Sequence, residues 1–177
     1  MEACAAGSLD FIPESYKRSI PMWPAPRPPT PAERARLVSG HLPALATCAF
    51  EVSAPATHPA LIGQFVAPYN CLGWVIDQEY PFHYWPPDDA RFAGQSPMSI
   101  MDAYFSHRGM PRAAVLPPNP AKAIALYARS ADDPTHVALL RSDGRWESKL
   151  GQDVRIIHPH LTDLDGPAYG SVAGYYL

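Results

Sequence analysis

The stretch from Ala123 to Lys149, AIALYARSADDPTHVALLRSDGRWESK, decides the fold class. It contains two apolar runs, Ala123–Arg129 and His136–Arg141, and each has the length and composition of a β-strand. The tetrapeptide SDGR, residues 142–145, is a hairpin-turn signal that leads the chain back through Trp146–Lys149. We therefore predict three consecutive strands that form part of an antiparallel sheet.

Segments on both sides of this stretch complete the predicted domain. Val154–His158 and Ser171–Leu177 extend the sheet to about five strands. Two helix-like segments come earlier, at Cys71–Gln78, where Asn70 is able to cap the first turn, and at Ser96–Gly109. Helices followed by an antiparallel sheet indicate an α+β fold with the helices packed on the sheet.

The composition of the chain changes near residue 60. Residues 1–60 are rich in proline and alanine, and a polyproline-like run precedes an expected helix, Pro31–Val38, with Thr30 as its cap. A short strand is expected at Ala46–Val52. We expect this extension to wrap the main domain, residues 61–177, or to dock a partner.

Charge and cysteine content exclude several classes of protein. The net charge is −3 and there is no basic cluster, so nucleic acid is not an expected partner. Cys4, Cys48 and Cys71 are widely spaced, which does not match a disulfide framework or a metal knuckle. No signal peptide or apolar run of about 20 residues is evident, so we expect no membrane contact and a cytoplasmic location, with signal-independent export as an effector as the alternative.

Cys71 and His136 are the candidate nucleophile and base. A cysteine at a helix N-terminus is favoured as thiolate by the helix dipole, and a histidine on a neighbouring strand can accept its proton. This chain order resembles that of papain-like thiol hydrolases, including small bacterial enzymes that cut peptidoglycan peptides. The resemblance implies a papain-like arrangement in which a third residue orients the imidazole.

Three residues are candidates for that third role. Glu147 and Ser148 are neighbours on one strand, so their side chains point to opposite faces and at most one of them meets His136. A two-residue turn at residues 143–144 would put Glu147 on the histidine's face, whereas a longer turn would select Ser148. His158, on the following strand, is the third option.

Other residues are candidates for binding substrate. The Cys71 backbone N–H with the side-chain amide of Asn70 or Gln64 would form an oxyanion hole. Trp74 and Trp85 would line a substrate cleft, as aromatic side chains often do. Lys149, if it lies beside the thiolate, would lower the pKa of the thiol.

Two alternatives compete with the thiol enzyme. Free cysteine is often buried, so Cys71 can be an inert core residue of a binding or interaction module. His158 and His160 can instead bind a metal with Asp163 and Asp165 nearby, but Pro159 ends the strand and no further ligand has a characteristic spacing. We therefore predict no metal and no other cofactor.

The chain from about Gln64 to its C-terminus resembles an uncharacterised, mostly bacterial family, a domain of unknown function. The resemblance implies that Cys71, His136, Ser148, Lys149 and His158 belong to one pattern, and it implies no activity. The matching motifs are Asn70-Cys71-Leu72-Gly73-Trp74, Tyr84-Trp85-Pro86, Ile124-Ala125-Leu126-Tyr127-Ala128, Thr135-His136-Val137-Ala138, Gly144-Arg145-Trp146-Glu147-Ser148-Lys149-Leu150-Gly151, Ile156-Ile157-His158 and Gly166-Pro167-Ala168-Tyr169-Gly170.

The leading functional hypothesis is a cysteine-dependent hydrolase or acyl transferase acting on a protein or peptide. Cys71 would attack an amide or thioester carbonyl, and His136 would act as base and then as acid. Peptidase, amidase and deamidase activities share this acyl-enzyme step. The alternative is a non-catalytic binding module or effector domain on the same fold.

Overall fold

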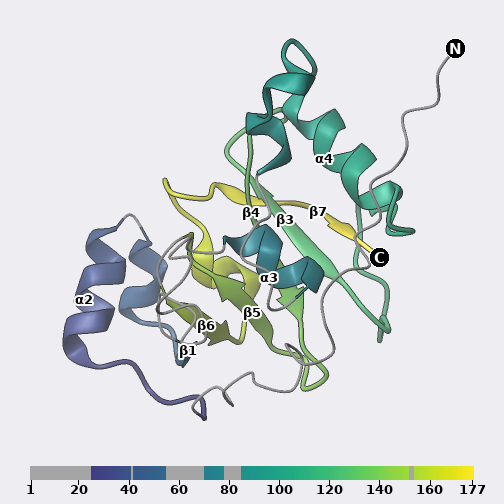
Figure 1. Ribbon diagram of the computed structural model, residues 1–177. Coiled ribbons are helices and arrows are strands. Elements are labelled where there is room, and N and C mark those ends of the chain that lie inside the picture. The colour runs from purple at the N-terminus through teal and green to yellow at the C-terminus, as the bar shows by residue number, and fades with distance from the viewer. Residues whose placement is uncertain (1–24, 41, 55–69, 78–84, 152–153) are drawn as a thin grey trace, which may run out of the picture.

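The computed structural model describes residues 25–40, 42–54, 70–77, 85–151 and 154–177. These residues form an α+β fold in which a few helices pack on one antiparallel sheet of seven strands (Figure 1). The strand order across the sheet is β1-β6-β5-β4-β3-β7-β2. The strands are β1 (Glu51–Ala54), β2 (Arg112–Ala113), β3 (Ile124–Ala128), β4 (Pro134–Leu140), β5 (Trp146–Lys149), β6 (Arg155–His158) and β7 (Ser171–Tyr176).

The helices begin where local hydrogen-bond signals favour them. Thr30 and Glu33 form the predicted capping box, in which the Thr30 hydroxyl accepts the Glu33 N–H at 3.2 Å. Ser96 likewise accepts the N–H of Ser99 at 3.2 Å. The α-helices are α2 (Pro31–Ser39), α3 (Cys71–Asp77) and α4 (Pro97–Ser106), and the 3-10 turns are η1 (Pro43–Ala46), η3 (Pro86–Asp88), η4 (Ala90–Phe92) and η5 (Leu161–Leu164).

The hairpin between β4 and β5 determines which side chains share a face. The Arg141 N–H donates to the Arg145 carbonyl at 2.9 Å, so residues 142–144 form the loop, with Gly144 at φ +80°. The loop is therefore longer than the two-residue turn considered above, and Leu139 pairs with Glu147. Because side chains alternate along a strand, Glu147 lies on the face of Leu139 and Ser148 lies on the other.

Each face of the sheet has its own hydrophobic core. We call one side the α3 face, because α3 and α4 cover it, and the other the α2 face, because α2, η1 and η5 cover it (Figure 1). The α3-face core includes Leu72, Met101, Phe105, Ile124, Leu126, Val137, Leu139 and Tyr176. The α2-face core includes Leu37, Leu45, Val52, Ala125, Tyr127, Ala138, Trp146, Ile156 and Leu164.

The prediction of about five strands is wrong, because β1 and the two-residue β2 bring the count to seven. β1 begins at Glu51, later than the predicted strand Ala46–Val52, and the first residue of that prediction, Ala46, is the last residue of η1. It pairs with β6, so the N-terminal region supplies an edge of the sheet and much of the α2-face core. The predicted boundary at residues 60/61 lies outside the described residues.

The proline-rich segment also contacts the edge of the sheet that β1 forms. Arg27 forms an isolated antiparallel bridge with Val52, in which the two backbones exchange hydrogen bonds of 3.1 and 2.7 Å. The proline-rich segment thus lies along β1 at this point.

No helix within the described part of the chain is long and apolar enough to cross a membrane.

Candidate functional site

Cys71 is the first residue of α3, and its thiol is buried. The Asn70 side-chain oxygen accepts the Gly73 N–H at 2.9 Å, which confirms the predicted cap. Cys71 is only 5% exposed and packs in the α3-face core. Burial raises the pKa of its thiol to about 11, although a hydrogen bond with the Val137 backbone and the charge of Lys149 act in the opposite direction. The thiol is therefore protonated at neutral pH.

His136 is fully buried on the α2 face. It pairs with Tyr127 across the β3–β4 ladder and stacks on Tyr169, with 4.1 Å between ring centroids. Neither ring nitrogen hydrogen-bonds to any group within the described residues. Burial, together with smaller contributions from the charges of His158 and Lys149, lowers the pKa of the imidazole to about 3. The ring is neutral at physiological pH.

The structure does not form the predicted Cys71–His136 pair. The β3–β4 register points Val137 toward α3, and its neighbour His136 points through to the α2 face. A thiolate–imidazolium pair requires the pKa of the thiol to lie below that of the imidazole. Here the pKa of Cys71 is the higher of the two. The sheet separates the candidate nucleophile from its candidate base.

Ser148 and His158 lie on the same face as His136 but bond to each other. The Ser148 hydroxyl is 3.0 Å from His158 Nε2, and His158 Nδ1 is 2.8 Å from the His160 carbonyl. Burial lowers the pKa of His158. A neutral ring that donates from Nδ1 to the carbonyl must accept the Ser148 hydroxyl at Nε2. Ser148 therefore orients His158, and not His136.

This pairing also bears on the metal alternative. Both ring nitrogens of His158 are engaged by groups of the chain itself. Among the residues described, no group of three or more His, Cys, Asp or Glu side chains is arranged to hold a metal ion.

The remaining candidates are dispersed. Lys149 is fully buried, and its Nζ donates to the Gly151 carbonyl at 2.8 Å. Trp85 directly precedes η3 and is partly buried against the α3-face core. Gln64 lies outside the described residues. Trp74 and Glu147 are the two that meet at a common site, and this site differs from the predicted one.

A cavity of about 480 Å³ lies on the α3 face beside the turn between β4 and β5. We call it the Trp74 cavity. This volume falls within the roughly 300–1,000 Å³ that small-ligand sites occupy. Its described lining residues are Ala25, Pro26, Ser53, Trp74, Leu139, Leu140, Arg141, Ser142, Glu147 and Arg155.

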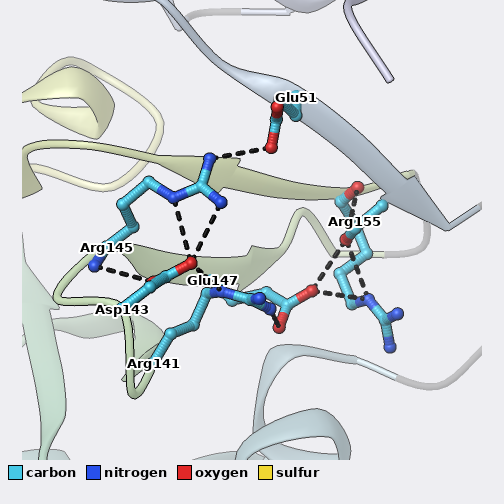
Figure 2. Close-up of polar contacts among 7 residues, drawn as sticks. Glu51, Arg141, Asp143, Arg145, Glu147 and Arg155 are labelled. Carbon is cyan, nitrogen blue, oxygen red and sulfur yellow. Dashed lines mark hydrogen bonds and ion pairs between the residues drawn. The ribbon is translucent and has the colours of Figure 1, made fainter. Parts of the chain in front are cut away.

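Glu147 is the buried charge in this cavity, and three groups hold its carboxylate. The Ser53 hydroxyl donates to Oε1 at 2.7 Å, and Arg155 Nε lies 3.0 Å from the same oxygen. Arg141 Nη1 donates to Oε2 at 3.0 Å, as Figure 2 shows. Glu147 is 4% exposed, so removing its buried partner Arg155 would leave a carboxylate in a poorly solvated place with only the partly exposed Arg141 as a counter-charge.

Trp74 forms one wall of the cavity. The Arg155 guanidinium lies over its ring, 3.8 Å from the centroid, which is a cation–π arrangement. Trp74 is 6% exposed, and its indole N–H has no hydrogen-bond acceptor within the described part of the chain. A buried donor without an acceptor is costly.

A second set of charges braces the turn at the rim. Arg145 lies between Glu51 and Asp143, with ion pairs of 2.8 and 3.0 Å (Figure 2). The Asp143 side chain also accepts the Arg145 backbone N–H at 3.1 Å. These three residues do not line the cavity. Asp143 also pairs with Arg141 Nε at 3.3 Å, so this set of charges positions Arg141.

Sequence reasoning did not select Ser53, Arg141 or Arg155. A signal for Arg155 was present, because it is the single charged residue in the apolar strand segment VRIIH. A charge in a buried strand is expected to have a partner. Arg141 and Ser53 carried no such signal, because polar residues are common beside turns and loops. Arg141 directly precedes the turn residues Ser142-Asp143-Gly144, and Ser53 lies next to the end of its strand.

The fold and the site thus define an α+β domain with a polar cavity on one face of its sheet. Residues 60–177 match the family described as a domain of unknown function (DUF7689), and the chain belongs to this family. Trp74, Arg141, Glu147 and Arg155 lie inside the matched region, whereas Ser53 lies before it. Comparison with curated proteins and with solved structures finds no match.

Proposed function

We propose that this protein is a ligand-binding module and that its site is the Trp74 cavity. One observation carries the proposal: Trp74, Glu147 and Arg155 are buried, hold one another in place and line a cavity of small-ligand size. Ligand sites typically combine apolar walls with a few fixed polar groups. The Trp74 cavity has this composition.

The polar groups of the cavity are held before any ligand arrives. Glu147 takes three contacts from different elements, namely β1, the β4–β5 turn and β6. Arg155 is fixed by Glu147 on one side and by the Trp74 ring on the other. Preorganised groups lose little conformational entropy on binding, which favours recognition.

The competing hypothesis is the papain-like cysteine hydrolase or acyl transferase. That chemistry needs the sulfur and an imidazole within hydrogen-bond reach, or a thiol that is readily ionised. Cys71 and His136 lie on opposite faces, and burial raises the pKa of the thiol. For this reason we base the proposal on the cavity and not on Cys71.

The proposal is tested by observing Trp74 during a screen of small fragments, both charged and neutral. Protein with ¹⁵N-labelled indoles gives one N–H resonance for each of its four tryptophans, and the variant Trp74→Phe assigns the one that matters. We expect saturable shifts of the Trp74 resonance. Trp146 is the internal control, because it is buried on the α2 face. A screen in which no fragment shifts Trp74 would overturn the proposal.

A further inference from the structure

One turn of the chain, residues 166–170, covers the ring of His136 on the α2 face, and we call it the Tyr169 turn. Tyr169 lies nearly flat on the imidazole, with 16° between the two ring planes, and it is itself only partly buried. His136 is fully buried beneath it. The Tyr169 turn therefore separates one face of this imidazole from solvent.

The Tyr169 turn is a compact unit that is docked on the sheet. Its two end residues, Gly166 and Gly170, exchange backbone hydrogen bonds of 2.9 and 2.7 Å. The Thr135 hydroxyl of β4 donates to the Tyr169 carbonyl at 2.6 Å and ties the turn to the sheet. Gly170 has φ +77°, and a Cβ at this position would collide with the Ala128 carbonyl of β3. The glycine at this end of the turn therefore permits both the close docking and a change of backbone direction.

His136 has no partner for a proton while the turn is closed. Neither ring nitrogen has a hydrogen-bond partner within the described part of the chain. An imidazolium would therefore bury a positive charge together with two unpaired N–H donors. The Tyr169 ring offsets part of this cost, because an aromatic face attracts a cation, but it leaves both donors without acceptors.

The titratable groups on the elements around the ring supply no counter-charge. These groups are Tyr127, Lys149, His158, Asp163, Asp165 and Tyr169. Besides burial, the charges of His158 and Lys149 lower the pKa of His136. The charge of Asp163 acts on His158, and that of Asp165 acts on the buried tyrosine of β3. Among the described residues, no carboxylate pairs with the His136 ring. A protonated His136 is therefore favoured only where water reaches it.

The neighbouring groups cannot release the turn in acid themselves. Burial raises the pKa of the Asp165 carboxyl, so its protonation favours the closed turn and acts in the opposite sense to that of His136. His158 keeps its bonds to Ser148 and to the His160 carbonyl when the turn opens, because none of these three residues belongs to the turn. The effect of acid on the turn therefore depends on His136.

We propose that the Tyr169 turn is an acid-sensitive cover, which is released from the sheet when His136 takes up a proton. The release exposes this part of the α2 face to solvent. An accessible histidine has an ordinary pKa of about 6.5, so the open form gains population as the pH falls below that value. The cover lies on the opposite face of the sheet from the Trp74 cavity, and the proposal is independent of the proposed function.

Native-state amide hydrogen exchange of the full chain tests this proposal, because it measures how often each segment opens. The amide protons of Gly166 and Gly170 report on the turn, since two hydrogen bonds do not hold a turn that has left the sheet. Those of Leu126 and Val137, in the central strands, report on global unfolding.

Exchange is compared at pH 7 and pH 5 after correction for the intrinsic rate at each pH. We expect the turn amides to have an opening constant at least about 10-fold larger than that of the sheet amides. We expect this constant to rise by about 25-fold from pH 7 to pH 5, because the open form binds a proton that the closed form excludes.

Two variants isolate the contribution of His136. His136→Phe keeps a ring to stack on Tyr169, His136→Gln keeps a polar side chain, and neither of them titrates. Each should abolish the rise in the opening constant of the turn. The matched control is His160→Gln, which removes an exposed imidazole directly before η5 and should retain the rise.

Three outcomes would overturn the proposal. If the turn amides open no more often than the sheet amides, the opening is global unfolding and the turn is not a separate cover. If the turn opens separately but its opening constant is the same at pH 7 and pH 5, protonation does not release it. If the rise persists in either non-titrating variant that folds, another group is responsible. None of these results bears on ligand binding at the Trp74 cavity.

Discussion

The guanidinium of Arg155 lies over the indole of Trp74 while its Nε contacts the carboxylate of Glu147, so two strands and one helix meet at a single buried cation. The contact joins α3 to β5 and β6, and all three residues line the Trp74 cavity. Both charges are almost fully buried. Stability and the shape of the site therefore depend on the same residues.

Arg155→Leu should destabilise the protein strongly. It leaves Glu147 buried with only Ser53 and the rim residue Arg141, and breaking a buried pair from one side typically costs about 3–5 kcal/mol. Urea denaturation followed by circular dichroism measures the free energy of unfolding. The double variant Arg155→Leu with Glu147→Leu should recover much of the loss, because no unpaired charge remains. Equal losses in the single and double variants would contradict this account.

His136 should make stability depend on pH. Its folded pKa of about 3 lies below the ordinary value of 6.5, so the unfolded chain takes up a proton that the folded protein does not. Stability is therefore complete above pH 6.5 and is lost as the pH falls toward 3. We expect His136 to account for a decrease of about 2 kcal/mol between pH 7 and pH 5.

The control for this pH dependence is His136→Phe. Phenylalanine retains a ring to stack on Tyr169 but does not titrate. Urea unfolding of both proteins at pH 7 and pH 5 isolates the contribution of His136 from that of other titrating groups, His158 included. If the wild-type protein and the variant lose the same free energy between the two values, His136 is not buried in its neutral form.

Ser148→Ala should cost about 1–3 kcal/mol of stability. The variant removes the hydroxyl that His158 Nε2 accepts, and a buried acceptor without a donor bears its full desolvation penalty. Ser142→Ala is the matched control, since Ser142 is exposed in the β4–β5 turn and should change stability by less than about 0.5 kcal/mol. Thermal and urea unfolding of the two variants give the comparison. Similar values would show that the Ser148–His158 bond contributes nothing.

Local signals in the sequence predicted where helices and strands lie more successfully than they predicted which face of the sheet each side chain occupies. Thr30, Asn70 and Ser96 each bond to a backbone N–H within three residues, and this depends only on nearby sequence. The face of Glu147 depends instead on whether the SDGR loop has two or three residues, and Asp143-Gly144 is compatible with both. A change of one residue in register transfers every side chain to the other face.

The same limitation explains why the Cys71–His136 pair was predicted. The sequence indicated a helix start and a neighbouring strand, and both are present. The sequence did not show which of the neighbours His136 and Val137 points toward the helix. The structure has Val137 in that position, and the β3–β4 ladder contains an irregularity next to His136. The strand β1 was placed too early for a different reason, since alanine- and proline-rich segments have weak strand signals.

The reaction rate of the Cys71 thiol is the measurement that tests most directly the central proposal, namely that the site of this protein is the Trp74 cavity and not a Cys71 nucleophile. A variant with Cys4→Ser and Cys48→Ser leaves Cys71 as the single thiol. We predict that a thiol reagent at pH 7.5 labels Cys71 no faster than the protein unfolds, and equally slowly with His136→Phe in addition. Labelling that is faster than unfolding and is slowed by His136→Phe would contradict the account and favour the cysteine hydrolase.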